Sequence, residues 1–196
     1  MDRVKLEENF AWRGFGLSVF PTRGEAVRYL DGKVDGVSVG IGGSMTVKEI
    51  GLYDALAAHN QVHWHMGTGK IADANRAEVY ISSLNALAET GELINIDGVG
   101  NRVSATAYGA KRVYFVVGRN KLAPDFQQAL WRARNIAAPK NAARLQVSTP
   151  CVTETPPRCH DCHSPGRICR ELLVLWTRPR PVEEMEVILI EEDLGY

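Results

Sequence analysis

Stretches that read as β-strands alternate with stretches of helical periodicity along most of this chain. The clearest strand is expected at residues 112–118, RVYFVVG, where β-branched and aromatic residues run up to a glycine. Strands that alternate with helices indicate an α/β fold, with a mostly parallel sheet and flanking helices on both faces. The other expected strands lie at residues 15–20, 37–41, 78–83, 92–97, 172–177 and 185–192.

Proline, threonine and glycine mark the expected helix boundaries. Pro21 and Thr22 are placed to start one helix, and a second follows the glycine pair at residues 42–43. Residues 124–139 predict a third helix, which Pro139 is expected to stop. The last two expected strands are interpreted as a hairpin.

The composition is that of an ordinary globular chain. It has 196 residues, 45% of them hydrophobic, which suits a single domain over residues 1–196. The 23 basic and 23 acidic residues balance, so no overall field favours nucleic acid or anionic lipid. No apolar run approaches the ~20 residues that span a bilayer, and the charged N-terminus lacks the apolar core of a signal peptide. We therefore expect a cytoplasmic protein without a membrane span or a nucleic-acid partner.

All four cysteines fall in one aperiodic loop, expected at residues 148–170 and rich in proline, threonine and histidine. A loop of this length in a compact domain is either disordered or held by something other than a core. In a reducing cytosol, clustered cysteines are better metal ligands than disulfide partners. A metal centre would supply the missing cross-links. The predicted ligands are Cys151, Cys159, Cys162 and Cys169.

Two metal centres fit the spacing C-x7-C-x2-C-x6-C. Zinc takes four thiolates in closed structural sites, and a [4Fe–4S] cluster also takes four cysteine ligands. Zinc sites more often contain two C-x2-C pairs, whereas this loop has one, Cys159 and Cys162. The uneven spacing favours the cluster and leaves zinc, disulfides or free thiols as alternatives. His160 and His163 are expected to be exposed loop residues, because the cysteines already number four.

A glycine-rich turn at residues 40–46, GIGGSMT, joins an expected strand to an expected helix. Backbone N–H groups in such a turn, together with a helix start, can bind an anion, and hydroxyl groups add donors. The turn matches neither Walker A nor the G-x-G-x-x-G fingerprint, and a tight turn with a serine N-cap is the structural alternative. The predicted ligand-binding residues are Gly42, Gly43, Ser44 and Thr46.

Two further polar, glycine-bearing loops follow expected strands. Open α/β sheets place their ligands at the carboxyl ends of strands. Asp-Gly and Gly-Asn are also common turn formers, but three such loops together favour one shared pocket for a small anionic ligand. The predicted ligand-binding residues are Asp97, Gly98, Asn101 and Arg102 from one loop, and Gly118, Asn120 and Lys121 from the other.

The sequence contains no evident catalytic triad, so the catalytic residues are unassigned. Candidates are Glu92, at a strand start beside a glycine, and Asp97 and Lys121 in the polar loops. A surface glutamate is the structural alternative for Glu92. His63 and His65 would face one side of a strand, but no third ligand lies nearby in the sequence, which disfavours a metal role.

Long strings from about residue 36 to the C-terminus resemble the LUD (lactate-utilisation) domain family. They are GGSMTVKEIGLYDAL, ISSLNALAETGELINIDGVGNRV, VYFVVGRNKLAPD, RARNIAAPKNAARL, the four-cysteine loop and VILIEEDLGY. The resemblance implies the fold shared by NagB, ribose-5-phosphate isomerase and CoA transferases, with ligands at the strand ends. It also implies that the turn at residues 40–46 binds phosphate or a carboxylate-bearing group. Some members belong to an iron–sulfur complex that oxidises L-lactate to pyruvate, and others stand alone.

Three functional hypotheses follow. In the first, the chain carries a [4Fe–4S] cluster and is linked to oxidation of L-lactate or a similar small 2-hydroxy acid, with possible iron–sulfur partner subunits. In the alternative, a non-redox α/β protein or enzyme binds a phosphate- or acyl-bearing ligand and carries a structural zinc. In the third, the metal loop of a scaffold docks a partner. Catalytic activity and homo-oligomer formation stay open at this point.

Overall fold

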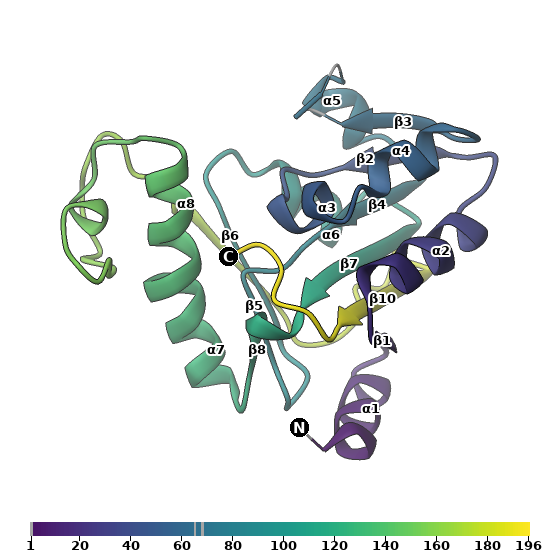
Figure 1. The fold of residues 1–196 in the computed structure, drawn as a ribbon, viewed down its shortest axis with the longest axis horizontal. Helices are drawn as coiled ribbons and strands as arrows, with labels where there is room; N and C mark the ends of the chain where they lie inside the picture. The colour runs from purple at the N-terminus through teal and green to yellow at the C-terminus, as the bar shows by residue number, and fades with distance from the viewer. Residues whose placement is uncertain (1, 65, 68) are drawn as a thin grey trace.

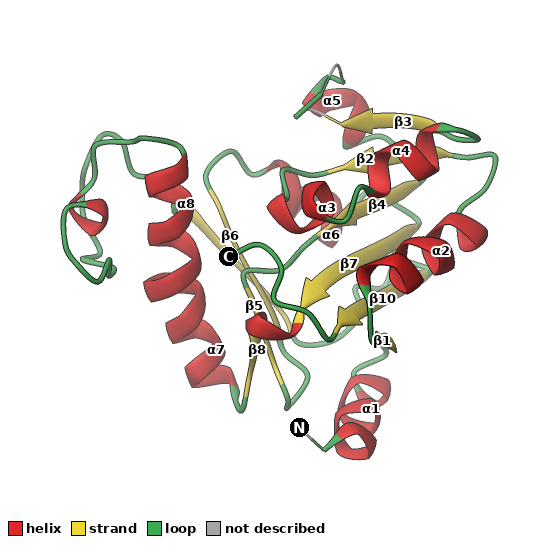
Figure 2. Cartoon of the chain, in the orientation of Figure 1, coloured by secondary structure: helices red, strands yellow, loops and turns green. Residues whose placement is uncertain are grey.

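The computed structural model describes residues 2–64, 66–67 and 69–196, so His65 lies outside the described residues. Its largest element is a six-stranded sheet with the order β1-β10-β7-β4-β2-β3, and every neighbouring pair runs parallel (Figures 1 and 2). The predicted α/β fold with a mostly parallel sheet and flanking helices is confirmed. The strands are β1 (Gly16–Phe20), β2 (Ser38–Ile41), β3 (Gln61–Trp64), β4 (Val79–Ser82), β7 (Arg112–Gly118) and β10 (Glu184–Ile190).

A second, four-stranded sheet with the order β8-β5-β6-β9 packs beside the first. Its strands β5 and β8 pair parallel, whereas β6 pairs antiparallel with both β5 and β9. The sequence did not indicate this second sheet, because β5 and β8 are too short to show a period. The strands are β5 (Ala86–Ala88), β6 (Leu93–Asp97), β8 (Leu122–Ala123) and β9 (Glu171–Leu175).

The predicted hairpin of the last two strands is wrong. Strand β9 pairs with β6 at the edge of the second sheet, whereas β10 lies between β1 and β7 in the first. Burial explains the separation, since β10 is almost wholly buried and β9 is largely exposed at its start. A strand covered on both faces suits the middle of a parallel sheet, and a half-exposed strand suits an edge.

Apolar side chains cover both faces of the parallel sheet. In β7, Tyr114 and Val116 face one cluster, whereas Phe115 and Val117 face the other, as the strand alternation requires. The first cluster is completed by helices α2 (Arg23–Lys33), α3 (Met45–Glu49) and α4 (Leu52–Ala57). The second is completed by α1 (Arg3–Trp12), α5 (Ile71–Ala74), α6 (Asn101–Ala107) and the inner face of the second sheet.

The third predicted helix does not end at Pro139. It continues from α7 (Phe126–Arg132) through a π-helical segment (Ala133–Ala137) into α8 (Ala138–Arg144), and it covers the outer face of the second sheet (Figure 1). Pro139 lies in the first turn of α8, directly after the π-helical segment. The regular hydrogen-bond ladder is already interrupted there, so the missing N–H of the proline is tolerated.

The four cysteines lie between α8 and β9, in a loop whose regular element is a short 3-10 turn (Pro150–Val152). In Figure 1 this loop projects from the end of α8, away from the parallel sheet. Within the part of the chain that the structure describes, we find no helix with the length and apolarity that a membrane crossing requires.

Gly40 gives a test of the packing between β2 and α5. A Cβ at Gly40 would lie 2.0 Å from the Ala74 carbonyl oxygen, so Gly40→Ala should lower the free energy of unfolding by about 1–3 kcal/mol or more through overpacking. The matched control is Gly32→Ala in α2, where a Cβ meets nothing within 4 Å. That change should stabilise the helix by about 0.5–1 kcal/mol. Urea denaturation of both variants checks the prediction, and equal effects at the two positions would contradict it.

Candidate functional site

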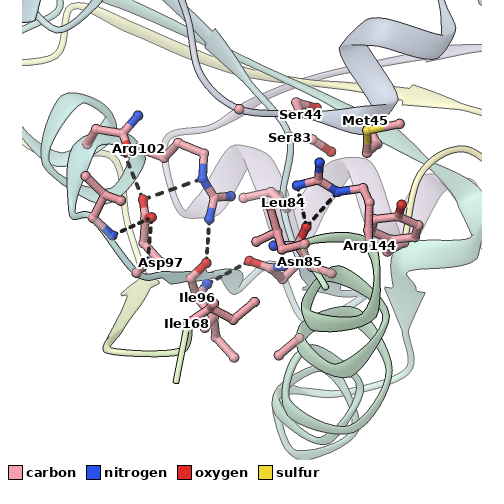
Figure 3. A pocket seen from close by; sticks show the side chains of 18 of the residues that line it. Ser44, Met45, Ser83, Leu84, Asn85, Ile96, Asp97, Arg102, Arg144 and Ile168 are labelled. Carbon is pink, nitrogen blue, oxygen red and sulfur yellow. Dashed lines mark hydrogen bonds and ion pairs between the residues drawn. The ribbon is translucent and has the colours of Figure 1, made fainter. Parts of the chain in front are cut away.

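A cavity of about 420 Å³ opens at the carboxyl ends of β2 and β4 (Figure 3). Within the parallel sheet, the strand that follows β2 is β3 on one side, and the strand that follows β4, after β5 and β6 of the second sheet, is β7 on the other side. Ligands of open α/β sheets bind at such a reversal of strand order, and the volume is typical of small-molecule sites. The end of β6 and the helix α8 complete the wall.

The structure brings residues from all three predicted polar loops to this cavity. Those that line it are Gly43, Ser44, Asp97, Gly98, Asn101, Arg102 and Lys121. The other lining residues were not predicted: Met45, Met66, Ser83, Leu84, Asn85, Ile96, Val99, Ala138, Asn141, Arg144, Leu145, Arg167, Ile168 and Tyr196. Ser83 and Asn85 directly follow β4, so the strand-end signal that found the other loops would also have found them.

Asp97 ends β6 and holds the start of α6. Its carboxylate accepts hydrogen bonds from the backbone N–H groups of Gly98 (2.7 Å) and Arg102 (3.0 Å) and, over longer distances, of Val99 and Val103. Burial tends to raise the pKa of Asp97, but the Arg102 guanidinium and the backbone N–H groups outweigh it and lower the pKa. Because its acceptor positions are used, this candidate catalytic residue serves as a structural cap.

Arg102 places a fixed positive charge in the cavity wall. Its Nη1 donates to Asn95 Oδ1 at 3.2 Å and its Nη2 to the Ile96 carbonyl oxygen at 2.5 Å, while Nε lies 3.5 Å from Asp97 (Figure 3). Gly42 does not line the cavity but allows this packing. A Cβ at Gly42 would lie 2.9 Å from Arg102 Cγ and 2.8 Å from Tyr80 Oη.

The turn after β2 is a tight turn with a serine N-cap, and it also lies at the cavity. Ser44 Oγ accepts a hydrogen bond from Val47 N at 3.1 Å and is the N-cap of α3. Gly43 and Ser44 also line the cavity, whereas Thr46 is fully buried beneath it. Thr46 reaches the site indirectly, because its hydroxyl accepts a hydrogen bond from Lys121.

Lys121 is the most unusual ionisable group of the site. It is 4% exposed, and its Nζ donates to Thr46 Oγ1 at 2.8 Å and to Ser83 Oγ at 3.0 Å. Burial lowers the pKa of Lys121 to about 7, and the positive charges of Arg132 and Arg102 act in the same direction, while Glu49 opposes them. A substantial fraction of the amine is therefore neutral at physiological pH.

Gly118 and Asn120, two predicted ligand-binding residues, lie outside the cavity. Asn120 Oδ1 accepts from Leu194 N at 3.1 Å, and its Nδ2 donates to the Gly195 carbonyl oxygen at 3.4 Å. A Cβ at Gly118 would lie 2.6 Å from Asn120 Oδ1. Both residues therefore hold the segment after β10 in place, which brings that segment against the lysine.

Glu92, the third candidate catalytic residue, also lies away from the cavity. Its carboxylate pairs with Arg13 at 2.5 Å and accepts a hydrogen bond from the Thr90 hydroxyl. The side chains of the pair are 13% and 14% exposed, and Arg13 also donates to the Trp176 carbonyl oxygen. The Glu92–Arg13 ion pair therefore holds the end of α1 against the second sheet.

Arg144 is the most important cavity residue that the sequence did not indicate. Its guanidinium donates to Asn141 Oδ1 at 3.0 and 2.8 Å, and the described residues include no carboxylate paired with it. Both residues line the cavity from α8. They were missed because the helix was expected to stop at Pro139, five residues earlier along the chain.

The four cysteines line a second, smaller cavity. Arg134 Nη2 lies 3.7 Å from Cys159 Sγ, and Thr149 Oγ1 lies 3.3 Å from Cys151 Sγ. Among the described residues, no three histidine, cysteine or acidic side chains are arranged to hold one metal ion. The volume of this second cavity is about 20 Å³, which is room for one water-sized group.

Cys169 lies beside Arg167, and its thiol has a shifted pKa. Burial raises the pKa of Cys169, and the nearby Cys159 adds to this, whereas Arg167 opposes it. Arg167 also organises the loop backbone, because its Nε donates to the Cys169 carbonyl oxygen and its Nη1 to that of Cys162, both at 2.7 Å.

The two cavities share a wall. Ala138, Arg167 and Ile168 line both of them. The Arg170 N–H donates to the Asp97 carbonyl oxygen at 2.8 Å, so the cysteine loop is anchored directly at the end of β6. A Cβ at Gly98 would lie 2.4 Å from the Ile168 carbonyl oxygen, and only glycine allows this close approach.

Because the amine of Lys121 is buried, we expect the free energy of unfolding to depend on pH. In the unfolded chain Lys121 has its ordinary pKa of 10.5, so between pH 7 and 10.5 the unfolded state binds the extra proton and stability rises with pH. Lys121→Met removes this dependence. Thermal melts from pH 6 to 10 should show the wild type gaining stability relative to the variant above about pH 7. Lys140→Met, at an exposed position on α8, should follow the wild type, and parallel curves for Lys121→Met would contradict the assignment.

Comparisons with known proteins identify the family. The LUD domain model matches residues 4–190. No curated protein matches the chain. The crystal structure of a DUF162 family protein from Deinococcus radiodurans is similar over 96% of this chain and 95% of that one, with 12% sequence identity and a TM-score of 0.54, a likeness that shows the fold alone. Because the family model spans nearly the whole sequence, the chain belongs to the LUD domain family.

Proposed function

We propose that the chain binds a small carboxylate- or phosphate-bearing molecule in the cavity of about 420 Å³ and holds a metal centre at its four cysteines. The observation that carries this proposal is the wall of Ala138, Arg167 and Ile168 between the two cavities. A ligand on one side and a metal on the other would be separated by the thickness of single side chains. The ligand position at strand ends of a parallel sheet supports the NagB, ribose-5-phosphate isomerase and CoA transferase type of fold.

Charge in the cavity selects an anion. The described lining residues include the cations Arg102, Arg144 and Arg167, of which Arg167 pairs with Asp161, against a single acidic side chain, Asp97. Asp97 is already neutralised by Arg102 and by backbone N–H groups. Arg144 keeps donors for a ligand, and guanidinium groups bind carboxylate and phosphate in matching planar geometry.

L-Lactate or a similar 2-hydroxy acid is the proposed ligand. Its carboxylate would bind Arg144. Its oxidation to a 2-oxo acid would remove the hydrogen on C2 together with two electrons, which an oxidant on a partner subunit would have to accept, and would also remove the proton of the C2 hydroxyl. The neutral amine of Lys121 is the group that would accept this proton, since a general base works best with a pKa near the working pH. Lys121 is therefore the candidate that we retain as catalytic, in preference to Glu92 and Asp97.

A [4Fe–4S] cluster is the proposed metal centre. The donor set has the right chemistry, because four cysteine thiols line one cavity and such a cluster takes four thiolates, but the loop would have to rearrange to bring the sulfurs around one centre. When bound, the cluster would supply one-electron chemistry, and iron–sulfur partner subunits would carry electrons onward. Most of the loop lies outside helices and strands, and its hydrogen bonds come mainly from side chains such as Arg167, so its backbone would have to shift to admit the cluster.

A structural zinc in a non-redox protein is the second candidate. The observation that favours it is the small volume, about 20 Å³, of the cavity that the four cysteines help to line, which suits an ion more closely than a cluster. Zinc would draw all four sulfurs to about 2.3 Å from one centre and lock the loop. The ligand would then be a phosphate- or acyl-bearing molecule, with no electron transfer.

Arg144→Ala tests the anion cavity. Loss of a charged hydrogen-bond donor should weaken the binding of L-lactate, pyruvate or inorganic phosphate by about 10–100-fold, measured by titration calorimetry. Arg3→Ala is the matched control, because Arg3 is an exposed arginine of α1 that pairs with Glu7 outside the cavity. Unchanged affinity in Arg144→Ala, or no binding of any of the three ligands to the wild type, would refute the proposed site.

Metal content after anaerobic purification decides between the two centres. About four irons per chain with a brown colour would support the cluster, and about one zinc in a colourless protein would support the second candidate. Cys162→Ser should abolish metal binding in either case, whereas His163→Ala, an exposed residue of the same loop, should retain it. Full metal content in Cys162→Ser would show that the four-thiolate assignment is wrong.

A further inference from the structure

The hydrogen-bond partners of Lys121 leave one position on its amine open. A neutral amine has two N–H groups and one lone pair. The two N–H groups have acceptors in Thr46 Oγ1 at 2.8 Å and Ser83 Oγ at 3.0 Å. The nitrogen lone pair is therefore the part of the amine that remains available to a molecule in the cavity, which Lys121 lines.

The two hydroxyl groups act as acceptors because their own protons are directed elsewhere. The Ser83 hydroxyl donates to Thr46 Oγ1 at 3.3 Å, and the Thr46 hydroxyl donates to the Leu194 carbonyl oxygen at 3.4 Å. Neither proton is needed by the lysine. This chain of hydroxyls orients the nitrogen and does not block it.

The surroundings of Lys121 also favour the uncharged amine. The ion pairs of the described residues do not include Lys121, and the positive charges of Arg132 and Arg102 act on it from nearby. The segment after β10 closes over it, since a Cβ at Gly195 would lie 3.2 Å from Nζ. Desolvation and neighbouring cations are the two conditions that make a lysine amine nucleophilic in proteins.

We propose that Lys121 Nζ forms an imine with the carbonyl carbon of a small 2-oxo acid bound in the cavity. The lone pair attacks the carbonyl carbon and a C–N bond forms. The carbonyl oxygen then leaves as water with the two protons of the amine, so no oxidant or reductant is needed. Arg144 holds the carboxylate of the 2-oxo acid. This inference rests on the proposed function for the ligand class but assigns a covalent step that the proposed function does not contain.

Reductive trapping tests the imine. The full chain is incubated with pyruvate and cyanoborohydride, and intact mass spectrometry should show one reduced pyruvate adduct per chain, saturating with pyruvate concentration. Peptide mapping should place the adduct on Lys121. Lys121→Arg should lose it, whereas Lys140→Arg, at an exposed lysine on the neighbouring helix, should keep it.

Adducts spread over exposed lysines, or one that persists in Lys121→Arg, would overturn the proposal. If Lys121→Arg does not fold, as judged by circular dichroism, the position of the adduct in the wild type decides the question alone. Calorimetry with pyruvate separates the two levels of inference. If pyruvate binds but forms no adduct at Lys121, the imine is refuted and the proposed binding site stands. If pyruvate neither binds nor forms an adduct, the imine and the proposed binding site are both refuted.

Discussion

Parallel pairing in the six-stranded sheet is the constraint on which the rest of the structure depends. Because β2, β4 and β7 run in the same direction, the turns that follow them open at one edge of the sheet. Within this sheet the strand that follows β2 is β3 on one side, and the strand that follows β4, after β5 and β6 of the second sheet, is β7 on the other side, so a crevice forms between β2 and β4. The second sheet closes that crevice into a cavity, because Asp97 at the end of β6 meets the same edge.

Burial of cations gives this cavity its chemical character. Burial lowers the pKa of Arg132 to about 10, which leaves it charged, and its Nε donates to the Asn120 carbonyl oxygen at 2.7 Å. Lys121 is buried more deeply, starts from a lower ordinary pKa and is repelled by Arg132 and Arg102, so its pKa falls to about 7. A guanidinium also delocalises its charge, whereas a lysine ammonium is strongly hydrated and loses more on burial. Burial therefore leaves Arg132 charged and Lys121 partly neutral near pH 7.

The loop that carries the four cysteines also forms part of the wall of the larger cavity. Ile168 lies between Cys162 and Cys169 in the sequence, and its carbonyl oxygen packs against Gly98. Arg167 connects two loop carbonyl oxygens and faces both cavities. In the proposed function, a change in the loop on metal binding would reach the proposed ligand site through residues already in contact, and the two binding events would be linked reciprocally.

Strand patterns could be predicted from the sequence wherever burial makes them long. The strand at residues 112–118 was placed correctly because both of its faces are apolar and its ends are marked. The second sheet could not be predicted, since the three residues of β5 and two of β8 gain their identity from tertiary pairing. Pro139 misled the helix prediction for a similar reason. The π-helical segment before it packs against the second sheet, which the sequence did not indicate. Because the helix was expected to end at Pro139, Asn141 and Arg144 were not recognised as cavity residues.

The sequence by itself determined the α/β class, the family and the three loops at strand ends, because these depend on local periodicity and on residue types. It also placed Ser44, Asp97, Arg102 and Lys121 in those loops. Only the tertiary structure decided what each does. Asp97 caps the start of α6, and Asn120 hydrogen-bonds to the segment after β10. Lys121 is a buried amine that donates to two hydroxyl groups. The physical reason is that solvation and hydrogen-bond partners come from residues distant in the chain, and these set the charge that each side chain carries.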